Sequence, residues 1–172
     1  KCVQAVIAQI PYVDGQESLK LYPKKYLTKV SSIVAKDFMS KQLGLEPQTI
    51  AVVAESGIRC LASPDSYRGY LSIVPQHIER VVEIPARIMF SLARYRPIQD
   101  VRKISIPVFL LGATQDQLIP IEATRLCATN LAPFAQYHEF PIEHFDVYHG
   151  QWFEKNIQLQ INFLHQQIGV ES

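Results

Sequence analysis

The distribution of apolar and polar residues along the chain predicts an α/β protein. An apolar run over 108–111, between a proline and a glycine, is typical of a strand that is buried on both faces. An amphipathic pattern from Ile119 to Leu131 predicts a helix, and residues 136–140 predict a second strand. A strand, a helix and a strand in this order predict a parallel pair in an open sheet.

Two more elements belong to the same predicted sheet layer. Residues 2–10 predict a strand whose apolar positions do not alternate, which indicates that both of its faces are covered. A broad apolar side over 151–168 predicts a last helix that packs on the sheet, and Gly169 would end it. If the strand at 2–10 lacks a neighbour, its bare edge invites pairing, so we expect a dimer, aggregation or a physical partner.

The intervening segment is predicted to be mostly helical. Apolar residues that recur at three and four positions predict a helix over 23–43, with Gly44 as its C-cap. Ser63 and Pro64 predict a second helix start, with the serine as cap and the proline at the first helical position. Residues 83–85 predict the start of a third helix. The expected organisation of the single domain, 1–172, is a core strand at 1–10, a helical cap insertion at 11–103 and a core at 104–172.

Composition narrows the class of protein. Apolar residues make up 48% of the 172 residues and charged residues 19%, as in ordinary globular proteins. The formal charge of +1, with both signs scattered, argues against a nucleic-acid or membrane partner, and no apolar run approaches the ~20 residues of a membrane helix. Cys2, Cys60 and Cys127 are odd in number and far apart, which favours buried free thiols and a cytoplasmic location.

Two residues that suit acid–base chemistry follow neighbouring predicted strands. Asp116 comes after the strand at 108–111, and His144 comes after the strand at 136–140. Because the carboxyl ends of parallel strands meet at one edge of a sheet, we expect the carboxylate and the imidazole to lie together. Acyl transfer from a serine needs an imidazole base and a carboxylate that orients it. The simpler interpretation is that Asp116 caps the following helix and that His144 is a polar loop residue.

The residues around this pair resemble a known family. The run Leu-Leu-Gly-Ala-Thr-Gln-Asp-Gln-Leu-Ile-Pro over 110–120, followed by His-Phe-Asp-Val-Tyr over 144–148, resembles the end of an α/β-hydrolase. The resemblance implies that Asp116 is the triad acid and His144 the triad base. Glu143 stands where the family usually has glycine. The family's nucleophile lies in a G-x-S-x-G elbow, and no such motif occurs in this sequence.

The resemblance therefore implies the C-terminal half of a cap-bearing α/β-hydrolase, with about three mostly parallel strands. A serine from the missing half would attack an ester, thioester or amide bond of a small acyl substrate, without a cofactor or metal. We expect the partner to be the N-terminal half of the same hydrolase or a second copy that pairs through the first strand. The alternative is a non-catalytic interaction module that pairs through its exposed sheet edge, so enzymatic activity stays open.

Other candidate residues compete for these roles. Asp146 could replace Asp116 as the carboxylate, although we favour it as a cap or as a partner of the loop backbone. A zinc site could use the side chains of His138, His144, Asp146 and His149, but their spacing matches no metal motif. Ser56 could be a nucleophile, but Ile58 stands where an elbow needs glycine.

Two further groups of residues have simpler interpretations. Aromatic residues in the predicted cap could line a pocket, but their helical spacing favours packing; they are Tyr67, Tyr70, Phe90 and Tyr95. A basic run is interpreted as a solvated face, and it comprises Lys20, Lys24, Lys25 and Lys29.

Overall fold

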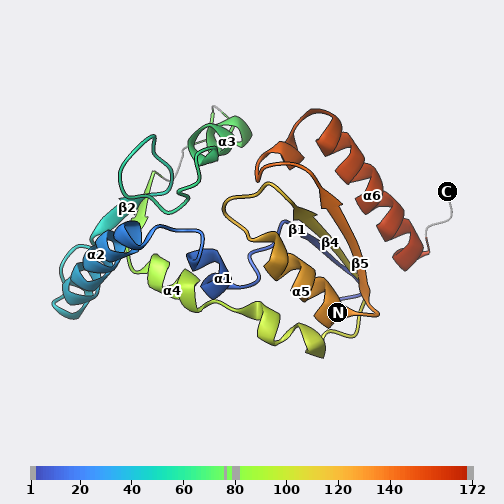
Figure 1. The fold of residues 1–172 in the computed structure, drawn as a ribbon, viewed down its shortest axis with the longest axis horizontal. Helices are drawn as coiled ribbons and strands as arrows, with labels where there is room; N and C mark the ends of the chain where they lie inside the picture. Colours follow the sequence, from blue (N-terminus) through green and yellow to red (C-terminus); the bar gives the residue numbers. More distant parts are fainter. Residues whose placement is uncertain (1–2, 76, 79–81, 170–172) are drawn as a thin grey trace. The chain divides into compact units, whose positions relative to one another are not determined.

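The computed structural model describes residues 3–75, 77–78 and 82–169, and the chain divides into two compact units (Figure 1). The first, which we call the sheet unit, joins Lys1–Asp14 to Arg96–Ser172, and the second, which we call the helical unit, is Gly15–Tyr95. The strands and helices of the sheet unit confirm the predicted α/β class. Among the described residues, none of the helices has both the length and the apolar character needed to cross a membrane.

The sheet unit contains a parallel three-stranded sheet in the order β1-β4-β5. Strand β1 is Val6–Gln9, β4 is Val108–Ala113 and β5 is Ala135–Phe140, and both pairings are parallel. The two strands predicted in the second half of the chain are therefore confirmed. Strand β1 is shorter than the predicted 2–10, and Cys2 lies outside the described residues. Each residue of β1 is half-buried, and Val6 and Ala8 pack against the core, so the predicted covering of its faces is partial.

Strand β4 forms the centre of the core, because all six of its residues are buried. Val108 and Leu110 pack with apolar residues of α5, which is Ile121–Leu131. The alternate residue Phe109 contacts Phe163 of α6, Gly150–Ile168, with ring centroids 5.8 Å apart. Successive side chains of a strand point to opposite faces, so the two helices cover opposite faces of the sheet (Figure 1).

Helix α6 packs on the sheet as predicted, and it is also tied to β1 by polar contacts. Asn156, which is 1% exposed, donates from its amide nitrogen to the Oε1 atom of Gln9 at 2.5 Å, and Gln160 donates to the same oxygen at 3.0 Å. The helix ends at Gly169, whose φ of 63° is in the left-handed region that glycine adopts without strain.

A buried ion pair joins the two sequence segments of the sheet unit. The carboxylate of Asp14, with 4% of its side chain exposed, accepts hydrogen bonds from Nε and Nη2 of Arg96 at 2.9 and 2.8 Å. The chain then forms two short 3-10 helices, Pro97–Gln99 and Val101–Lys103, before it enters β4. The bidentate geometry is strong because both hydrogen bonds are charge-assisted.

The described residues of the helical unit form six elements. They are α1 (Gly15–Leu19), α2 (Lys24–Gln42), β2 (Thr49–Ala51), α3 (Ser66–Ile73), β3 (Glu83–Pro85) and α4 (Ile88–Arg94). Helix α2 confirms the prediction over 23–43. It ends in a Schellman motif, in which Gly44 has a φ of 68° and the N–H of Leu45 donates to the carbonyl oxygen of Ser40 at 2.9 Å.

Two predicted helix starts are wrong. Helix α3 begins at Ser66, not at Pro64, because the Ser63 hydroxyl is hydrogen-bonded to the side chains of Asp65 and Ser66 in a turn. Residues 83–85 form strand β3, which pairs antiparallel with β2, and not the start of a helix.

A distant residue determines where α4 begins. The fully buried carboxylate of Asp37 accepts hydrogen bonds from the backbone N–H groups of Arg87 and Gln48 at 2.8 and 3.0 Å. The two N–H groups lie just before β2 and α4. The residues next to them in the sequence do not indicate that a carboxylate of α2 accepts their hydrogen bonds.

The cysteines that the structure describes agree with the prediction of buried free thiols. Cys60 lies in the core of the helical unit, Cys127 lies in the core of the sheet unit, and both are buried and free. Burial raises the pKa of both thiols, which keeps them protonated and poorly nucleophilic near neutral pH.

Candidate active site

The carboxylate of Asp116 lies just beyond the carboxyl end of β4 and is held by the backbone that follows it. Its Oδ1 atom accepts the N–H of Leu118 at 2.6 Å and the N–H of Ile119 at 2.9 Å. The side chain is fully buried. A short polar side chain that bonds the backbone two and three residues ahead is a local turn motif, so the residues after β4 fix the orientation of the carboxylate.

The second oxygen of this carboxylate meets an imidazole. The Nδ1 atom of His144 lies 2.7 Å from Oδ2 of Asp116, and the imidazole side chain is 21% exposed. The ring also packs edge-on against Phe145, with centroids 4.8 Å apart. The structure therefore brings together the two residues that the sequence placed at neighbouring strand ends.

The parallel ladder continues beyond the strands and brings the two loops into register. Ala113 is paired with Phe140, the N–H of Thr114 donates to the carbonyl oxygen of Phe140 at 2.9 Å, and the N–H of Gln115 donates to that of Ile142 at 3.1 Å. Because these backbone bonds immediately precede Asp116 and His144, the spacing of the side chains follows from the strand pairing.

The arrangement can hold and move a proton at one defined atom. A carboxylate accepts only, so Nδ1 of the neutral ring carries the hydrogen and Nε2 presents a lone pair. Within the described part of the chain, no residue forms a hydrogen bond with Nε2 of His144. The imidazole can therefore take a proton at Nε2, and the adjacent carboxylate stabilises the resulting cation.

The rival carboxylate has a different role in the structure. Asp146 is exposed, and its Oδ2 atom accepts the backbone N–H of Glu143 at 3.0 Å. This bond confirms the loop-backbone role that we favoured for Asp146. It also closes the turn around His144 at the position where the α/β-hydrolase family usually has glycine.

The other candidates lie apart from this pair. His138 is in β5, where its ring packs on Phe109 with centroids 5.3 Å apart, and burial lowers its pKa. Ser56 is exposed in a bend of the helical unit and does not follow a strand directly. Over the described residues, no three His, Cys, Asp or Glu side chains gather as a metal site.

The two backbone N–H groups that hold the carboxylate of Asp116 were not predicted from the sequence. A signal was present, because an aspartate in the turn after a strand often accepts the backbone N–H groups two or three residues ahead in an Asx turn. The partners of the buried carboxylates Asp14 and Asp37 carried no such local signal, because they lie 82 and 50 residues away in the sequence.

The chain is similar to several known proteins, although no family model matches it. Over 169 residues it is 30% identical to the quorum-quenching protein AidA of Acinetobacter baumannii. This alignment covers 97% of this chain and 55% of AidA. The chain spans about half the length of the curated relatives that it matches.

Solved structures decide the fold. The alpha/beta hydrolase GrgF from Penicillium sp. sh18 superposes with a TM-score of 0.74 at 19% identity, over 97% of this chain and 56% of that one. The monoacylglycerol lipase of Paleococcus ferrophilus gives a TM-score of 0.61 at 18% identity, over 96% of this chain and 60% of that one. The chain has the α/β-hydrolase fold. Asp116 and His144 thus follow two neighbouring strands of an α/β-hydrolase sheet.

Proposed function

We propose that this chain supplies the acid and the base of a serine hydrolase. The observation that carries the proposal is the 2.7 Å contact between Nδ1 of His144 and a fully buried carboxylate oxygen of Asp116. In serine–histidine–aspartate hydrolases, the carboxylate binds Nδ1 so that Nε2 faces the nucleophile. The α/β-hydrolase fold and relatives with the names of hydrolases support the same reaction class.

In this proposal the nucleophile is a serine outside the 172 residues. Nε2 of His144 accepts the hydroxyl proton while the serine oxygen bonds to the carbonyl carbon of an ester, thioester or amide. Asp116 keeps the ring oriented and stabilises the imidazolium. When the carbon–leaving-group bond breaks, Nε2 returns the proton to the leaving group. Water then repeats the sequence and releases the acid.

The helical unit is proposed to be the cap of this enzyme and to select a small acyl substrate. A cap can exclude water from the reacting carbonyl, which strengthens every charge interaction there. The name of the lipase relative agrees with an acyl ester as substrate. The part of the site that holds the serine determines whether the acyl group passes to water or to another acceptor.

The decisive experiment measures hydrolysis of p-nitrophenyl acetate by the whole protein to which this chain belongs. We expect His144→Ala and Asp116→Asn to lower kcat on the order of 10⁴-fold, as in other enzymes with this triad. The matched controls Asp146→Asn and His149→Gln should stay within a few fold. Full activity of His144→Ala would end the proposal, as would loss of activity in Ser56→Ala.

The ring tautomer can be tested on the 172-residue chain itself. Nitrogen-15 NMR should show the neutral ring of His144 with its hydrogen on Nδ1 and a bare Nε2. In Asp116→Asn, the amide nitrogen would donate to Nδ1, and the hydrogen should move to Nε2. A wild-type ring with its hydrogen on Nε2 would contradict the proposed role as base.

A second candidate function is an interaction module, and one observation favours it. Strand β1 is the edge of the three-stranded sheet, and its residues are only half-buried. An edge strand presents unpaired backbone groups that can bind a further strand. Sedimentation of the chain alone should then reveal a dimer or larger species; a monodisperse monomer at micromolar concentration argues against this candidate.

A further inference from the structure

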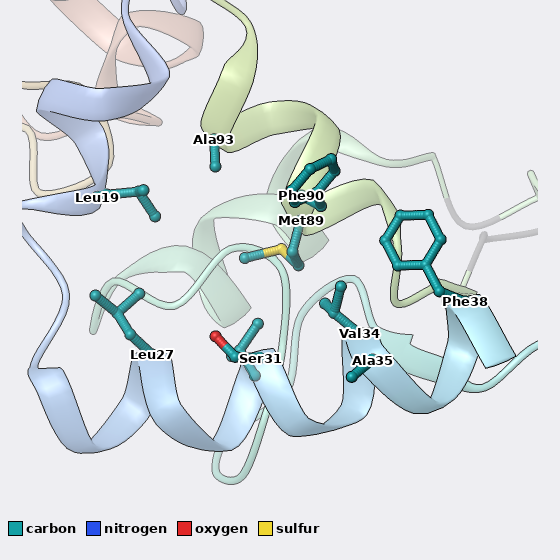
Figure 2. Close-up of a pocket in the computed structure, with 10 residues that line it drawn as sticks. Leu19, Leu27, Ser31, Val34, Ala35, Phe38, Met89, Phe90 and Ala93 are labelled. Atoms are coloured by element: carbon teal, nitrogen blue, oxygen red, sulfur yellow. The ribbon is translucent and has the colours of Figure 1, made fainter.

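The helical unit contains an apolar groove of about 440 Å³ between α2 and α4, with Leu19 of α1 at its side (Figure 2). Large apolar side chains from the two helices form its walls, among them Leu27, Val34, Phe38, Met89 and Phe90. The volume falls in the range of about 300–1,000 Å³ that is usual for small-molecule sites. Filling such a groove with an apolar group removes its walls from water, which is favourable.

Small residues in the two helices leave this space open. Leu27, Ser31 and Ala35 follow one another at four-residue spacing and therefore share one face of α2. Two of the three are small, and Ala93 of α4 is small as well. Phe38 and Phe90, which both line the groove, meet edge to face with ring centroids 5.5 Å apart. Ser31 is the one polar residue among those that line it.

The surroundings of the groove are positively charged. All five lysines of α2 are exposed, and its single acid, Asp37, is fully buried beside Arg87. Ala35 also lines an adjoining hollow, which Lys36 lines as well. The guanidinium of Arg94 lies 5.3 Å from the centroid of the Phe90 ring. Residues 15–95 contain eleven Lys and Arg residues and seven Asp and Glu residues. The helical unit is therefore basic, although the formal charge of the whole chain is only +1.

We propose that this groove binds the alkyl chain of a medium-chain carboxylate, whose head group lies beside Lys36. The walls fit an unbranched alkyl chain, because Ser31 is the one polar residue among those that line the groove. The lysine at the adjoining hollow fits the charge of a carboxylate, and no acid lines either hollow. Binding involves neither Asp116 nor His144, so it can hold or fail independently of the proposed hydrolase activity.

The first measurement is calorimetric titration of the 172-residue chain with hexanoate, octanoate and decanoate. Each methylene that the groove buries should tighten binding by up to about fourfold until the chain exceeds the groove. Affinity that is equal across the three lengths, or no binding of decanoate, would overturn the proposal.

A pair of adjacent serines provides a matched test of where the alkyl chain binds. Both Ser31 and Ser32 are exposed on α2, but only Ser31 lines the groove. Ser31→Phe should fill the groove and weaken decanoate binding by at least about tenfold, the loss of roughly two buried methylenes. Ser32→Phe adds the same ring outside the groove and should leave binding unchanged. Circular dichroism confirms that both variants keep their helices; equal affinities in two folded variants would refute the site.

A pair of lysines tests the head group. Lys36→Gln should weaken octanoate binding about two- to fivefold, the range of an exposed ion pair, and should not change binding of octan-1-ol. Lys41→Gln, which removes a charge that lines neither hollow, should change neither. If Lys36→Gln and Lys41→Gln weaken octanoate equally, or if Lys36→Gln weakens the alcohol as much, the head-group assignment is wrong.

Discussion

The structure predicts that Asp116→Ala and Asp116→Asn differ sharply in stability. The carboxylate accepts backbone N–H groups of Leu118 and Ile119, residues that are 4% and 6% exposed. Alanine leaves both donors without an acceptor, at about 1–3 kcal/mol each, so the free energy of unfolding should fall by about 2–6 kcal/mol. Asparagine retains the oxygen that accepts both hydrogen bonds. It should lower the free energy of unfolding by only about 1 kcal/mol, because the acceptor is no longer charged.

Urea unfolding followed by tryptophan fluorescence measures this difference. The single tryptophan, Trp152, lies in α6 of the sheet unit and packs on Phe140 with ring centroids 5.0 Å apart, so it reports the unit that contains Asp116. A loss of about 2–6 kcal/mol is a large part of the stability of a typical domain, about 5–15 kcal/mol, and clearly lowers the urea concentration at the unfolding midpoint while the m-value stays constant.

A surface aspartate provides the control for this comparison. Asp146 accepts a single backbone N–H and is exposed, so Asp146→Ala should cost no more than about 1 kcal/mol. Equal destabilisation by Asp116→Ala and Asp116→Asn would show that the two backbone bonds contribute little, and would refute the reasoning.

Three further predictions concern other parts of the chain. Arg96→Ala leaves the buried carboxylate of Asp14 without its bidentate partner and should cost about 3–5 kcal/mol in the same urea assay. Gly15→Ala places a methyl group 2.0 Å from a backbone carbonyl oxygen of α4, so the helical unit should lose about 3 kcal/mol or more, measured by circular dichroism. Burial and the nearby Lys155 lower the pKa of His138, so stability should decrease as pH falls below about 6.5, and His138→Gln should flatten this dependence of the urea midpoint.

The sequence predicted the sheet unit well because its elements have strong local patterns. Strand β4 is a continuous apolar run between a proline and a glycine, and the structure buries all six of its residues. Helix α6 has a broad apolar side and a terminal glycine, and both its length and its end follow from them. The pairing of Asp116 with His144 was predictable because parallel strands align their carboxyl ends.

The helical unit was less predictable because its short elements depend on distant partners. Residues 83–85 resemble a helix start, yet they form β3 because β2, more than thirty residues earlier, supplies the pairing strand. The real start of α4 depends on Asp37, which accepts the N–H of Arg87 from another helix. The groove was also invisible, because the small residues of two separate helices create it together.

The geometry of the acid–base pair depends on a small part of the chain. The turn at 116–119 and the loop that contains His144 supply every hydrogen bond described for the Asp116 side chain. Strand pairing sets the spacing of the two loops, and backbone donors fix the carboxylate. An imidazole oriented in this way needs only an approaching hydroxyl group to act as a base. We therefore expect the hydrogen on Nδ1 of His144 to be present in the 172-residue chain, before any nucleophile or substrate is added.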